Sequence, residues 1–261
     1  MNAGKTMSIH RHAMPDWIVP DWPAPANVHA LITTRIGGVS QGAFAGCNLG
    51  ETVGDDPRAV AENRALLRRL LPDEPRWMKQ VHGTRVLDAA DASDAQPADA
   101  AFSRRAGTVC AVQIADCLPV LLCDRAGSAV ALAHAGWRGL SAGVVELAVE
   151  RMRLAPPELI AYLGPAIGPG AFEVGDEVRE AFVRVDPRAE QAFVRHRADK
   201  WLADLFTLAR QRLARAGVQA VYGGGLCTVS DPRRFYSYRR DRTTGRMAAV
   251  IWLGAGPAGV A

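Results

Sequence analysis

The chain has 261 residues, of which 49% are hydrophobic and 22% are charged, and its formal net charge is +4. This composition is typical of a folded globular protein and excludes a disordered chain, which is poor in apolar residues. The sequence contains no run of about 18 apolar residues, which a membrane-spanning helix requires, so we expect no membrane partner. Five cysteines at irregular spacing indicate reduced thiols rather than a disulfide framework.

The first 20 residues contain no apolar stretch followed by a small-residue cleavage site. We therefore predict a flexible tail over residues 1–20 rather than a secretion signal, and a cytoplasmic protein. No change of composition divides the rest of the chain, and residues 21–261 are predicted to form one catalytic domain. The alanine- and aspartate-rich residues 88–101 are expected to be a surface connection within it.

Short apolar segments bounded by Gly, Asp or Pro predict strands along the chain. They cover residues 28–34, 76–82, 108–114, 118–124, 128–134, 158–164, 218–223 and 246–253. Three amphipathic segments predict helices over residues 56–71, 140–153 and 199–216. Because strands occur both in succession and separated by helices, we expect a mixed sheet with helices over its faces, in an α/β or α+β protein.

The basic charge is carried almost entirely by arginine, because Lys5, Lys79 and Lys200 are the only lysines. Arginine binds phosphate and carboxylate groups through paired hydrogen bonds, so this charge fits an anionic small molecule as readily as a nucleic acid. A nucleic-acid-binding element would interleave basic and aromatic residues, and no segment has that pattern. We therefore predict a small-molecule substrate and no nucleic-acid partner.

Two histidines and one cysteine stand at the ends of predicted strands, each beside a turn. His82 lies in the segment KQVHG, Cys117 ends IADC, and His134 begins HAGWRG. Side chains at the rim of a sheet are rigidly supported yet accessible, which is where sites are commonly built. One thiolate and two imidazoles suit zinc and leave a fourth position open, as in catalytic zinc sites. These three residues are therefore candidate metal ligands and catalytic residues.

The residues alone leave other interpretations open. A single histidine is more often packed or at the surface, and the spacing of the three residues matches no local zinc motif. Without a metal, Cys117 activated by His134 would form a nucleophilic dyad. Two histidines and a cysteine are also the core of a blue-copper site, although a multicopper cluster needs more imidazoles than the six histidines of this chain provide.

Glycine-rich turns that carry polar side chains supply candidate substrate-binding residues. Arg35 and Asn48 lie in the loop at 33–50, Arg138 lies where a helix begins after HAGWRG, and Arg239 lies in the turn SYRRDRTTGR. The first N–H groups of a helix lack partners, and an arginine beside them favours an anion. Arg138 can equally belong to a tight strand-to-helix turn that places Trp137 in the core.

Two carboxylates close to these motifs, Asp116 and Glu173, are candidates for proton transfer, and Asp116 is also explained as a buried residue that orients a neighbour. Cys110 and Cys123 lie within apolar strands, where a free cysteine behaves as a small hydrophobic residue. Cys117 and Cys123 are therefore expected to have different roles, although both belong to the stretch ADCLPVLLCD.

Several motifs together resemble those of the YfiH-like family, long called laccase-domain or multicopper polyphenol oxidase proteins. They are GGVSQGAF with NLG, KQVHG, ADCLPV, HAGWRG, LGPAIG with FEVGDEV, and FYSYRRDRTTGR. The resemblance covers nearly the whole chain. Gly46-Cys47, where the family often has Ser-Leu, and Gly170-Ala171, where it frequently has a pair with cysteine, are departures that bear on substrate contacts.

The resemblance implies an α+β fold with four layers, α/β/β/α, and mixed sheets, distantly similar to the cysteine hydrolase of a bacterial toxin, cytotoxic necrotizing factor. It implies zinc held by His82, Cys117 and His134, with copper as an alternative metal. It also implies a purine nucleoside phosphorylase that acts with phosphate on inosine, adenosine and methylthioadenosine and that deaminates adenosine. Purine nucleosides and phosphate are then the expected partners, and a homodimer is left open.

The same resemblance leaves two alternatives. Some bacterial members are credited with hydrolysing an amide in wrongly built peptidoglycan precursors, which would make this chain a cytoplasmic amidase that works by zinc hydroxide or by the Cys117–His134 dyad. A copper-dependent polyphenol oxidase, which the old family name suggests, is the lesser alternative.

Overall fold

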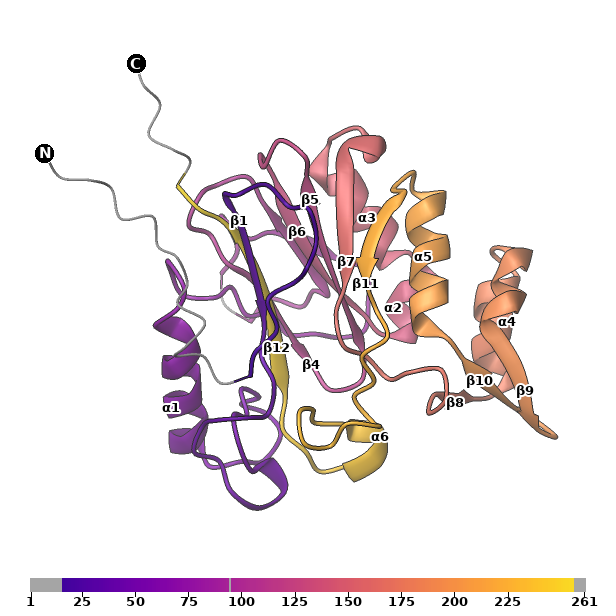
Figure 1. Cartoon of the computed structure of the whole chain (residues 1–261), viewed down its shortest axis with the longest axis horizontal. Coiled ribbons are helices and arrows are strands. Elements are labelled where there is room, and N and C mark those ends of the chain that lie inside the picture. The colour runs from indigo at the N-terminus through magenta and orange to yellow at the C-terminus, as the bar shows by residue number, and fades with distance from the viewer. Residues whose placement is uncertain (1–15, 94, 256–261) are drawn as a thin grey trace, which may run out of the picture.

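Two β-sheets lie face to face at the centre of the computed structural model, which describes residues 16–93 and 95–255 (Figure 1). The smaller sheet is antiparallel and consists, in spatial order, of β1 (Val28–Ile32), β12 (Met247–Leu253) and β4 (Cys110–Ile114). The larger sheet consists, in spatial order, of β11 (Ala220–Gly223), β7 (Leu159–Leu163), β5 (Leu118–Asp124), β6 (Val130–Ala135), β3 (Ala100–Ser103) and β2 (Val86–Asp88). Its outer pairs are parallel and its inner pairs antiparallel, so this sheet is mixed.

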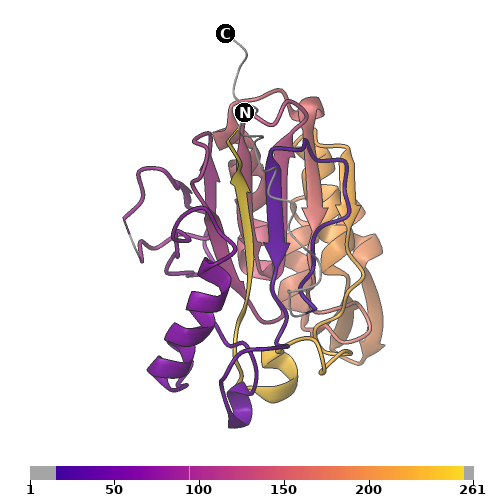
Figure 2. The same ribbon diagram turned by 60° about the vertical axis from the view of Figure 1, so that its left-hand side comes forward.

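Helices cover the outer faces of both sheets, as two views of the molecule show (Figures 1 and 2). Helix α1 (Pro57–Arg68) packs on the smaller sheet, and α2 (Trp137–Ala142), α3 (Val144–Met152) and α5 (Leu205–Arg215) pack on the larger one. Beyond them lie α4 (Asp176–Val183) and a third sheet with the spatial order β8 (Glu173–Val174), β10 (Lys200–Ala203) and β9 (Phe193–Arg197). Helix α6 (Tyr238–Asp241) is a single turn before β12, and short 3-10 helices cover Gly42–Phe44, Pro156–Glu158 and Pro187–Ala192.

Three separate hydrophobic cores hold these layers together. Consecutive strand residues point to opposite faces, so Leu121 packs between the two sheets while Leu122 packs under the helices of the larger sheet. In the same way Ile32 enters the core between the sheets and Leu31 enters the core under α1, where it joins Leu67. Strands buried on both faces have nearly continuous apolar sequences, which is why they could be predicted. The α+β fold with α/β/β/α layers is confirmed.

The predicted strand at 76–82 is wrong, because this segment makes only isolated bridges, Arg76 with Cys110 and Lys79 with Pro97. A side chain takes the place of strand pairing beside β4. The amide of Gln80 donates to the carbonyl of Gln113 at 2.9 Å and accepts from its N–H at 2.7 Å. These bonds satisfy the edge of β4 and leave the chain at 79–82 free to turn.

Two predicted helices are also corrected. The segment 140–153 is divided by Gly143, whose φ of 101° ends α2 and begins α3, and the first of these helices starts earlier, at Trp137. The segment 199–216 begins with strand β10, and α5 starts only after Asp204, whose carboxylate accepts hydrogen bonds from the N–H groups of Phe206 and Thr207.

The expected surface connection at 88–101 is confirmed for its middle, where residues 90–93 and 95–97 are exposed or half-buried, whereas its two ends are built into the fold. Ala89, Ala98, Asp99 and Ala100 are fully buried, and Ala100 begins strand β3. The predicted tail differs at its end, because Trp17 is buried and residue 18 pairs with residue 32; residues 1–15 lie outside the described residues. In the described parts of the chain, every helix is too short or too polar to cross a bilayer.

Candidate active site

The three candidate ligands meet at one end of the larger sheet. Cys117 directly precedes β5 and His134 lies in β6, and these antiparallel strands place Leu118 opposite Ala135. His82 reaches the same point from the loop before β2. The ligand atoms of the three side chains all lie within 4.8 Å of one another, and Sγ of Cys117 is 3.7 Å from Nε2 of His82.

Asp99 links two of these ligands. Its carboxylate accepts hydrogen bonds from the N–H groups of Val81, His82 and Gly83 at 3.1, 2.9 and 2.7 Å, and from Nδ1 of His134 at 2.8 Å. Burial opposes ionisation of Asp99, but the hydrogen bonds from His134 and from the backbone lower its pKa below the ordinary value. One buried carboxylate therefore holds both the loop that carries His82 and the ring of His134.

Two residues of the site have unusual backbone conformations. His82 has a φ of 59° and Asp116, which precedes Cys117, has a φ of 92°. Residues other than glycine rarely occupy this region, and strain of this kind gathers at functional sites. The turns at both positions aim His82 and Cys117 at each other instead of letting the chain continue in an extended conformation.

Gly136 leaves space beside the ligands. A Cβ atom at this position would lie 2.8 Å from Sγ of Cys117, closer than real Cβ atoms approach, and 3.0 Å from Cδ2 of His82, which is a tight contact. The backbone conformation of Gly136 is ordinary, with φ −63°, so the glycine is required by the neighbouring thiol rather than by its own dihedral angles.

The charges of the site are coupled. Burial opposes ionisation of the Cys117 thiol, but the charges and hydrogen bonds of His134 and His82 lower its pKa to about 6. Burial also opposes a charge on His134, yet the neighbouring Cys117 thiolate and the hydrogen bond to Asp99 raise its pKa to about 9. The metal-free protein therefore favours a thiolate and an imidazolium at neutral pH, and the thiolate is the form that binds a metal.

The geometry of the three side chains fits a metal ion. In a tetrahedral zinc site, bonds of about 2.3 Å to sulfur and about 2.1 Å to nitrogen separate the two ligand atoms by roughly 3.6 Å. The distance of 3.7 Å between Cys117 Sγ and His82 Nε2 agrees with this value. Because Nδ1 of His134 is bound to Asp99, Nε2 of that ring is the nitrogen left for a metal. The structure thus contains a possible His–Cys–His metal site.

Asp116 is buried and has both carboxylate oxygens engaged. One oxygen accepts from the hydroxyl of Thr228 and the other from the backbone N–H of Arg239, each at 2.6 Å, and its own carbonyl accepts from the N–H of Ile167 at 2.9 Å. These contacts tie the turn that carries Cys117 to two distant loops. They agree with the interpretation of Asp116 as a residue that orients its neighbours.

A cavity of about 980 Å³ opens in front of the three side chains. This volume is at the upper end of the usual range for ligand sites, about 300–1,000 Å³. Aromatic side chains from several elements line it: Trp77, Trp137, Phe172 and Tyr238. The carboxylates in its lining are those of Glu51 and Asp116.

Five arginines line the cavity, and one of them, Arg64, pairs with Glu51. In the described residues the other four form no ion pair with a carboxylate: Arg138, Arg239, Arg242 and Arg246. Arg138 stacks on Trp137 at 4.4 Å, and Arg239 lies over Phe172 at 5.4 Å while its Nη1 donates to the carbonyl of Glu173 at 2.9 Å. Cations without counter-charges around a cavity favour an anionic ligand. The sequence had indicated Arg138 and Arg239 for this purpose.

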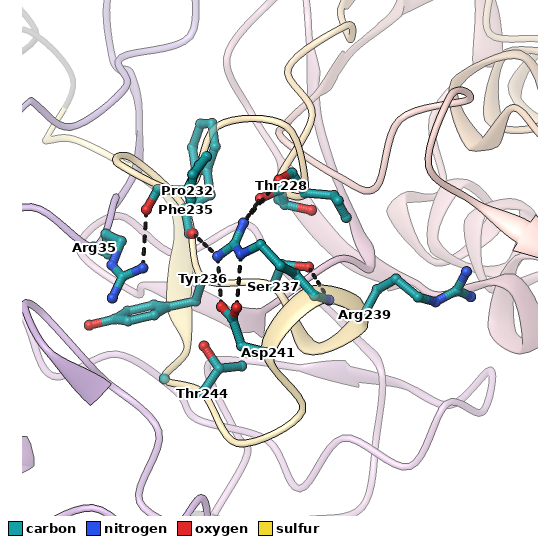
Figure 3. A network of polar contacts seen from close by, with 12 residues as sticks. Arg35, Thr228, Pro232, Phe235, Tyr236, Ser237, Arg239, Asp241 and Thr244 are labelled. Atoms are coloured by element: carbon teal, nitrogen blue, oxygen red, sulfur yellow. Dashed lines mark hydrogen bonds and ion pairs between the residues drawn. The ribbon is translucent and has the colours of Figure 1, made fainter. Parts of the chain in front are cut away.

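Arg35 and Asn48, the other expected substrate-binding residues, do not line the cavity. Arg35 donates to the carbonyls of Pro232 and Ala45 at 3.0 and 3.2 Å and lies over the ring of Tyr236. Figure 3 shows Arg35 on one side of this network and Arg239 on the other, pointing away from it. Asn48 is fully buried, and its side chain binds the backbone of Gly50 and the carboxylate of Asp55.

The remaining candidates are engaged elsewhere in the fold. Glu173 is absent from the cavity lining and pairs with Arg197 at 2.8 Å and His196 at 3.4 Å. His29 stacks on Trp252. Cys110 and Cys123 are buried, in agreement with their expected packing role, and Cys47 is buried as well. Cys227 is half-buried and accepts a hydrogen bond from the N–H of Gly168 at 3.2 Å.

Sequence reasoning missed several residues of this region, above all Asp99, Glu51, Trp77 and Arg246. Asp99 had one usable signal, its place as the last aspartate of the segment 88–101, directly before the apolar run AAF. Arg246 belongs to the turn SYRRDRTTGR, which was recognised as arginine-rich, but the sequence does not tell which of its arginines face the cavity.

The sequence profile of a family described as multi-copper polyphenol oxidoreductase laccase matches residues 29–254. The chain belongs to this family. Purine nucleoside phosphorylase PA4543 of Pseudomonas aeruginosa is 55% identical over 238 residues, which are 91% of this chain and 98% of that protein. Purine nucleoside phosphorylase YfiH of Escherichia coli is also 55% identical, over 239 residues that are 90% of this chain and 98% of that protein. The expected resemblance to YfiH is confirmed.

Solved structures that are similar in sequence to this chain have the same fold. The crystal structure of Neisseria meningitidis protein NMB0706, of family DUF152, matches with a TM-score of 0.89 and 52% sequence identity, over 92% of this chain and 99% of that chain. YlmD from Geobacillus stearothermophilus matches with a TM-score of 0.82 and 33% identity, over 88% of this chain and 93% of that chain. The four-layer arrangement is therefore shared by distant relatives.

Proposed function

We propose that this chain is a zinc-dependent purine nucleoside phosphorylase that acts on inosine, adenosine and methylthioadenosine and also deaminates adenosine. The observation that carries the proposal is the position of the His–Cys–His site in the wall of a cavity bordered by four arginines without carboxylate partners. The names of the relatives from Pseudomonas aeruginosa and Escherichia coli support the phosphorylase part of this proposal.

His82, Cys117 and His134 would hold the zinc ion, and Asp99 would keep the ring of His134 and the loop of His82 in place. When bound, zinc acts as a Lewis acid and lowers the pKa of a water in its open coordination position, which is the chemistry that deamination requires. Gly136 leaves the space in front of Cys117 free for the substrate atom that approaches the centre.

The rest of the cavity would bind the nucleoside and phosphate. Flat aromatic surfaces such as those of Trp77 and Trp137 suit a purine ring. The guanidinium groups of the lining suit the anionic reactant through charge-assisted hydrogen bonds, and Arg138 and Arg239 are among them. In phosphorolysis the phosphate attacks C1′ of the ribose while the bond to the purine breaks. Neutralising the phosphate and holding both reactants in one cavity lowers the barrier of this step.

Proton transfer would fall to a carboxylate in the cavity lining. Both oxygens of Asp116 are occupied by Thr228 and Arg239, so we assign Asp116 to positioning. Glu51 is the other carboxylate of the lining, where its side chain is 63% exposed and pairs with Arg64, and we assign proton transfer to it. The cytoplasmic location and a homodimeric assembly stay predictions.

A product assay tests this function. Zinc-loaded wild type is incubated with inosine and with adenosine, with and without phosphate, beside Cys117→Ser and the matched control Cys227→Ser. We expect phosphate-dependent ribose 1-phosphate from the wild type and the control, and none from Cys117→Ser. Inosine formed from adenosine without phosphate reports the deaminase activity. If the zinc-loaded wild type converts no nucleoside under any of these conditions, the proposal is wrong.

A second candidate rests on a specific arrangement. Cys117, His134 and Asp99 follow the order nucleophile, base and orienting acid that is known from cysteine hydrolases, with Asp99 2.8 Å from Nδ1 of His134. This order favours an amidase, and peptidoglycan precursors with a wrong first amino acid are the substrates to test. Hydrolysis that persists after complete removal of metal would identify the dyad, whereas hydrolysis that returns only with zinc would identify the metal-dependent variant.

A copper-dependent polyphenol oxidase is the least supported function. The donor set of the site also fits copper. The other histidines in the described residues, His29 and His196, bind Trp252 and Glu173 and lie outside the cavity lining, so they add no imidazole to the site. Oxidation of a phenol by copper-loaded protein, abolished in Cys117→Ser, would favour this function over the phosphorylase.

A further inference from the structure

Contacts with three neighbouring residues fix both the backbone and the side chain of Arg246. Its N–H donates to the side-chain oxygen of Asn48 at 2.8 Å, and its carbonyl accepts from the N–H of Leu49 at 3.0 Å. Its side chain runs along Gly50, where an added Cβ would lie only 2.8 Å from Cγ of Arg246. The buried Asn48 thus contributes to the cavity indirectly, because it fixes the start of β12 from which Arg246 projects.

The guanidinium of Arg246 is half-buried and has no anionic partner. Its Nη1 donates to the carbonyls of Thr244 and Gly245, each at 3.0 Å, and in the described residues Nε and Nη2 make no hydrogen bond. Burial lowers the pKa of Arg246, and the opposite charges that counteract this effect are those of Cys117, Asp116 and Tyr238. Cys117 is a candidate metal ligand, the carboxylate of Asp116 is already hydrogen-bonded to other residues, and Tyr238 carries a phenol group. None of the three forms an ion pair with the guanidinium of Arg246.

Burying part of a charged group without an oppositely charged partner costs free energy of folding. Binding of an ion from solution offsets this cost, which explains why such a group is kept. Arg242 adds a second cation on the same side of the cavity. The guanidiniums of Arg242 and Arg246 lie 5.7 and 6.0 Å from the centre of the Tyr238 ring. Both arginines line the cavity, so two guanidinium groups lie near the same tyrosine ring beside the candidate metal site, and each has several N–H donors.

We propose that Arg246, assisted by Arg242, binds the hydrogen phosphate ion and selects phosphate over water as the nucleophile that attacks the nucleoside. This inference rests on the proposed phosphorylase function and assigns its anion subsite. A phosphate oxygen forms the new bond to C1′ while the bond from C1′ to N9 breaks and its electron pair stays on the purine. The proton carried by hydrogen phosphate ends on the purine nitrogen, so the products are ribose 1-phosphate and the neutral base.

The selection has a simple physical origin. Water is smaller than phosphate and is always present, so it attacks whenever the phosphate subsite is empty. A charge-assisted, bidentate hydrogen bond from a fixed arginine keeps the subsite filled at low phosphate concentration. Weakening that bond should therefore change the product from ribose 1-phosphate to free ribose, while the contacts of the purine on the aromatic side chains are kept.

The experiment compares zinc-loaded wild type with Arg246→Gln, Arg246→Lys and the control Arg58→Gln, which changes an exposed arginine at the start of α1. The loss of one charged hydrogen-bonding group corresponds to about 1.5–3 kcal/mol, or roughly a 10- to 100-fold higher KM for phosphate in Arg246→Gln. The KM for inosine should stay within twofold, the share of free ribose should rise, and Arg246→Lys should be intermediate. Arg58→Gln should behave as wild type.

Calorimetric titration with inorganic phosphate, in the absence of nucleoside, gives an independent measurement. Arg246→Gln should lose at least tenfold in phosphate affinity while keeping the zinc content and the melting temperature of the wild type. Equal phosphate affinity in both proteins overturns the proposal, as does a parallel rise of both KM values. If the wild type converts no nucleoside, the phosphorylase function is wrong, and the calorimetric comparison still decides whether Arg246 forms an anion subsite.

Discussion

His134 donates its Nδ1 hydrogen to Asp99 at 2.8 Å, and neither side chain is more than 5% exposed. The same carboxylate receives the N–H of His82, so a single residue sets the position of two ligands that are far apart in the sequence. Metal binding at the proposed site should therefore be sensitive to the loss of this one carboxylate.

The first prediction concerns Asp99→Asn. The amide keeps the size of the side chain but loses the charge and one acceptor, so the ring of His134 and the loop of His82 are both held less firmly. Loss of such an outer partner typically lowers metal affinity by about 10- to 100-fold. Competition with a chromophoric chelator measures this affinity, and Asp88→Asn, at an exposed position of β2, is the control. Unchanged zinc affinity would show that Asp99 has only a structural role.

Gly136→Ala should remove the metal without unfolding the protein. The added methyl group would lie 2.8 Å from Sγ of Cys117, and the backbone of Gly136 already has dihedral angles that alanine accepts. We expect zinc content well below one ion per chain and a loss of activity, with an intact circular dichroism spectrum. Gly170→Ala, where no atom lies within 4 Å of the added carbon, should bind zinc normally. Full zinc occupancy in Gly136→Ala would contradict the proposed position of the ion.

The reactivity of Cys117 in the metal-free protein should depend on pH in an unusual way. Its pKa is lowered to about 6, so the thiolate forms as the pH rises through this value. The rate of alkylation by iodoacetamide should rise between pH 5 and about 7 and then stay level, whereas an ordinary thiol continues to gain reactivity beyond about pH 8.5. Peptide mass spectrometry follows Cys117 separately from the half-buried Cys227.

Two comparisons test the cause of this shift. Zinc should protect Cys117 wherever the ion stays bound, because the sulfur is then a ligand; protons displace the metal at acid pH, so protection should be lost there. In Asp99→Asn the imidazolium of His134 loses its carboxylate partner, so the pKa of His134 should fall and that of Cys117 should rise. An alkylation profile of Cys117 that still rises steeply between pH 7 and 9 in the wild type is the opposite of what we expect.

A prediction on stability concerns the start of α5. Asp204 caps this helix by accepting hydrogen bonds from the N–H groups of Phe206 at 2.9 Å and Thr207 at 3.1 Å. Asp204→Ala should lower the free energy of unfolding by about 0.5–2 kcal/mol, the usual effect of a lost N-cap. Urea denaturation measures it, with Asp199→Ala in the exposed turn as the control. An equal effect of both substitutions would mean that the cap adds nothing.

The sequence allowed the fold to be predicted where a strand is buried on both faces, as in β5 and β12, because such strands are continuous apolar runs. Cys117 and His134 could be predicted as partners for a related reason, since they flank strands that are neighbours in one hairpin. His82 was predicted as the end of a strand, yet it lies in a loop whose pairing is replaced by the side chain of Gln80. The feature that correctly indicated His82 as a ligand was its position beside a turn, and not the predicted strand.

Other parts of the site depend on contacts that sequence patterns do not contain. Asp99 acquires its role only after the parallel pairing of β2 and β3 brings it under the loop of His82. Arg239 and Arg240 are adjacent, but Arg239 lines the cavity while Arg240 is bound to Asp241 and to the carbonyls of Thr228 and Phe235. The single turn of α6 separates them, and nothing in the local sequence distinguishes the two arginines.

The positive φ angles of His82 and Asp116 have a consequence for the evolution of this chain. Each such conformation costs on the order of 1–3 kcal/mol for a residue with a side chain, and glycine would relieve the cost at either position. Selection for thermal stability alone, in the absence of metal and substrate, would therefore favour glycine at position 82, where it removes a ligand. At position 116 the carboxylate offsets the cost through its hydrogen bonds to Thr228 and Arg239. Laboratory evolution of a variant with higher thermal stability should therefore include a measurement of bound metal in every round. Strongly stabilising substitutions are expected at the candidate metal site.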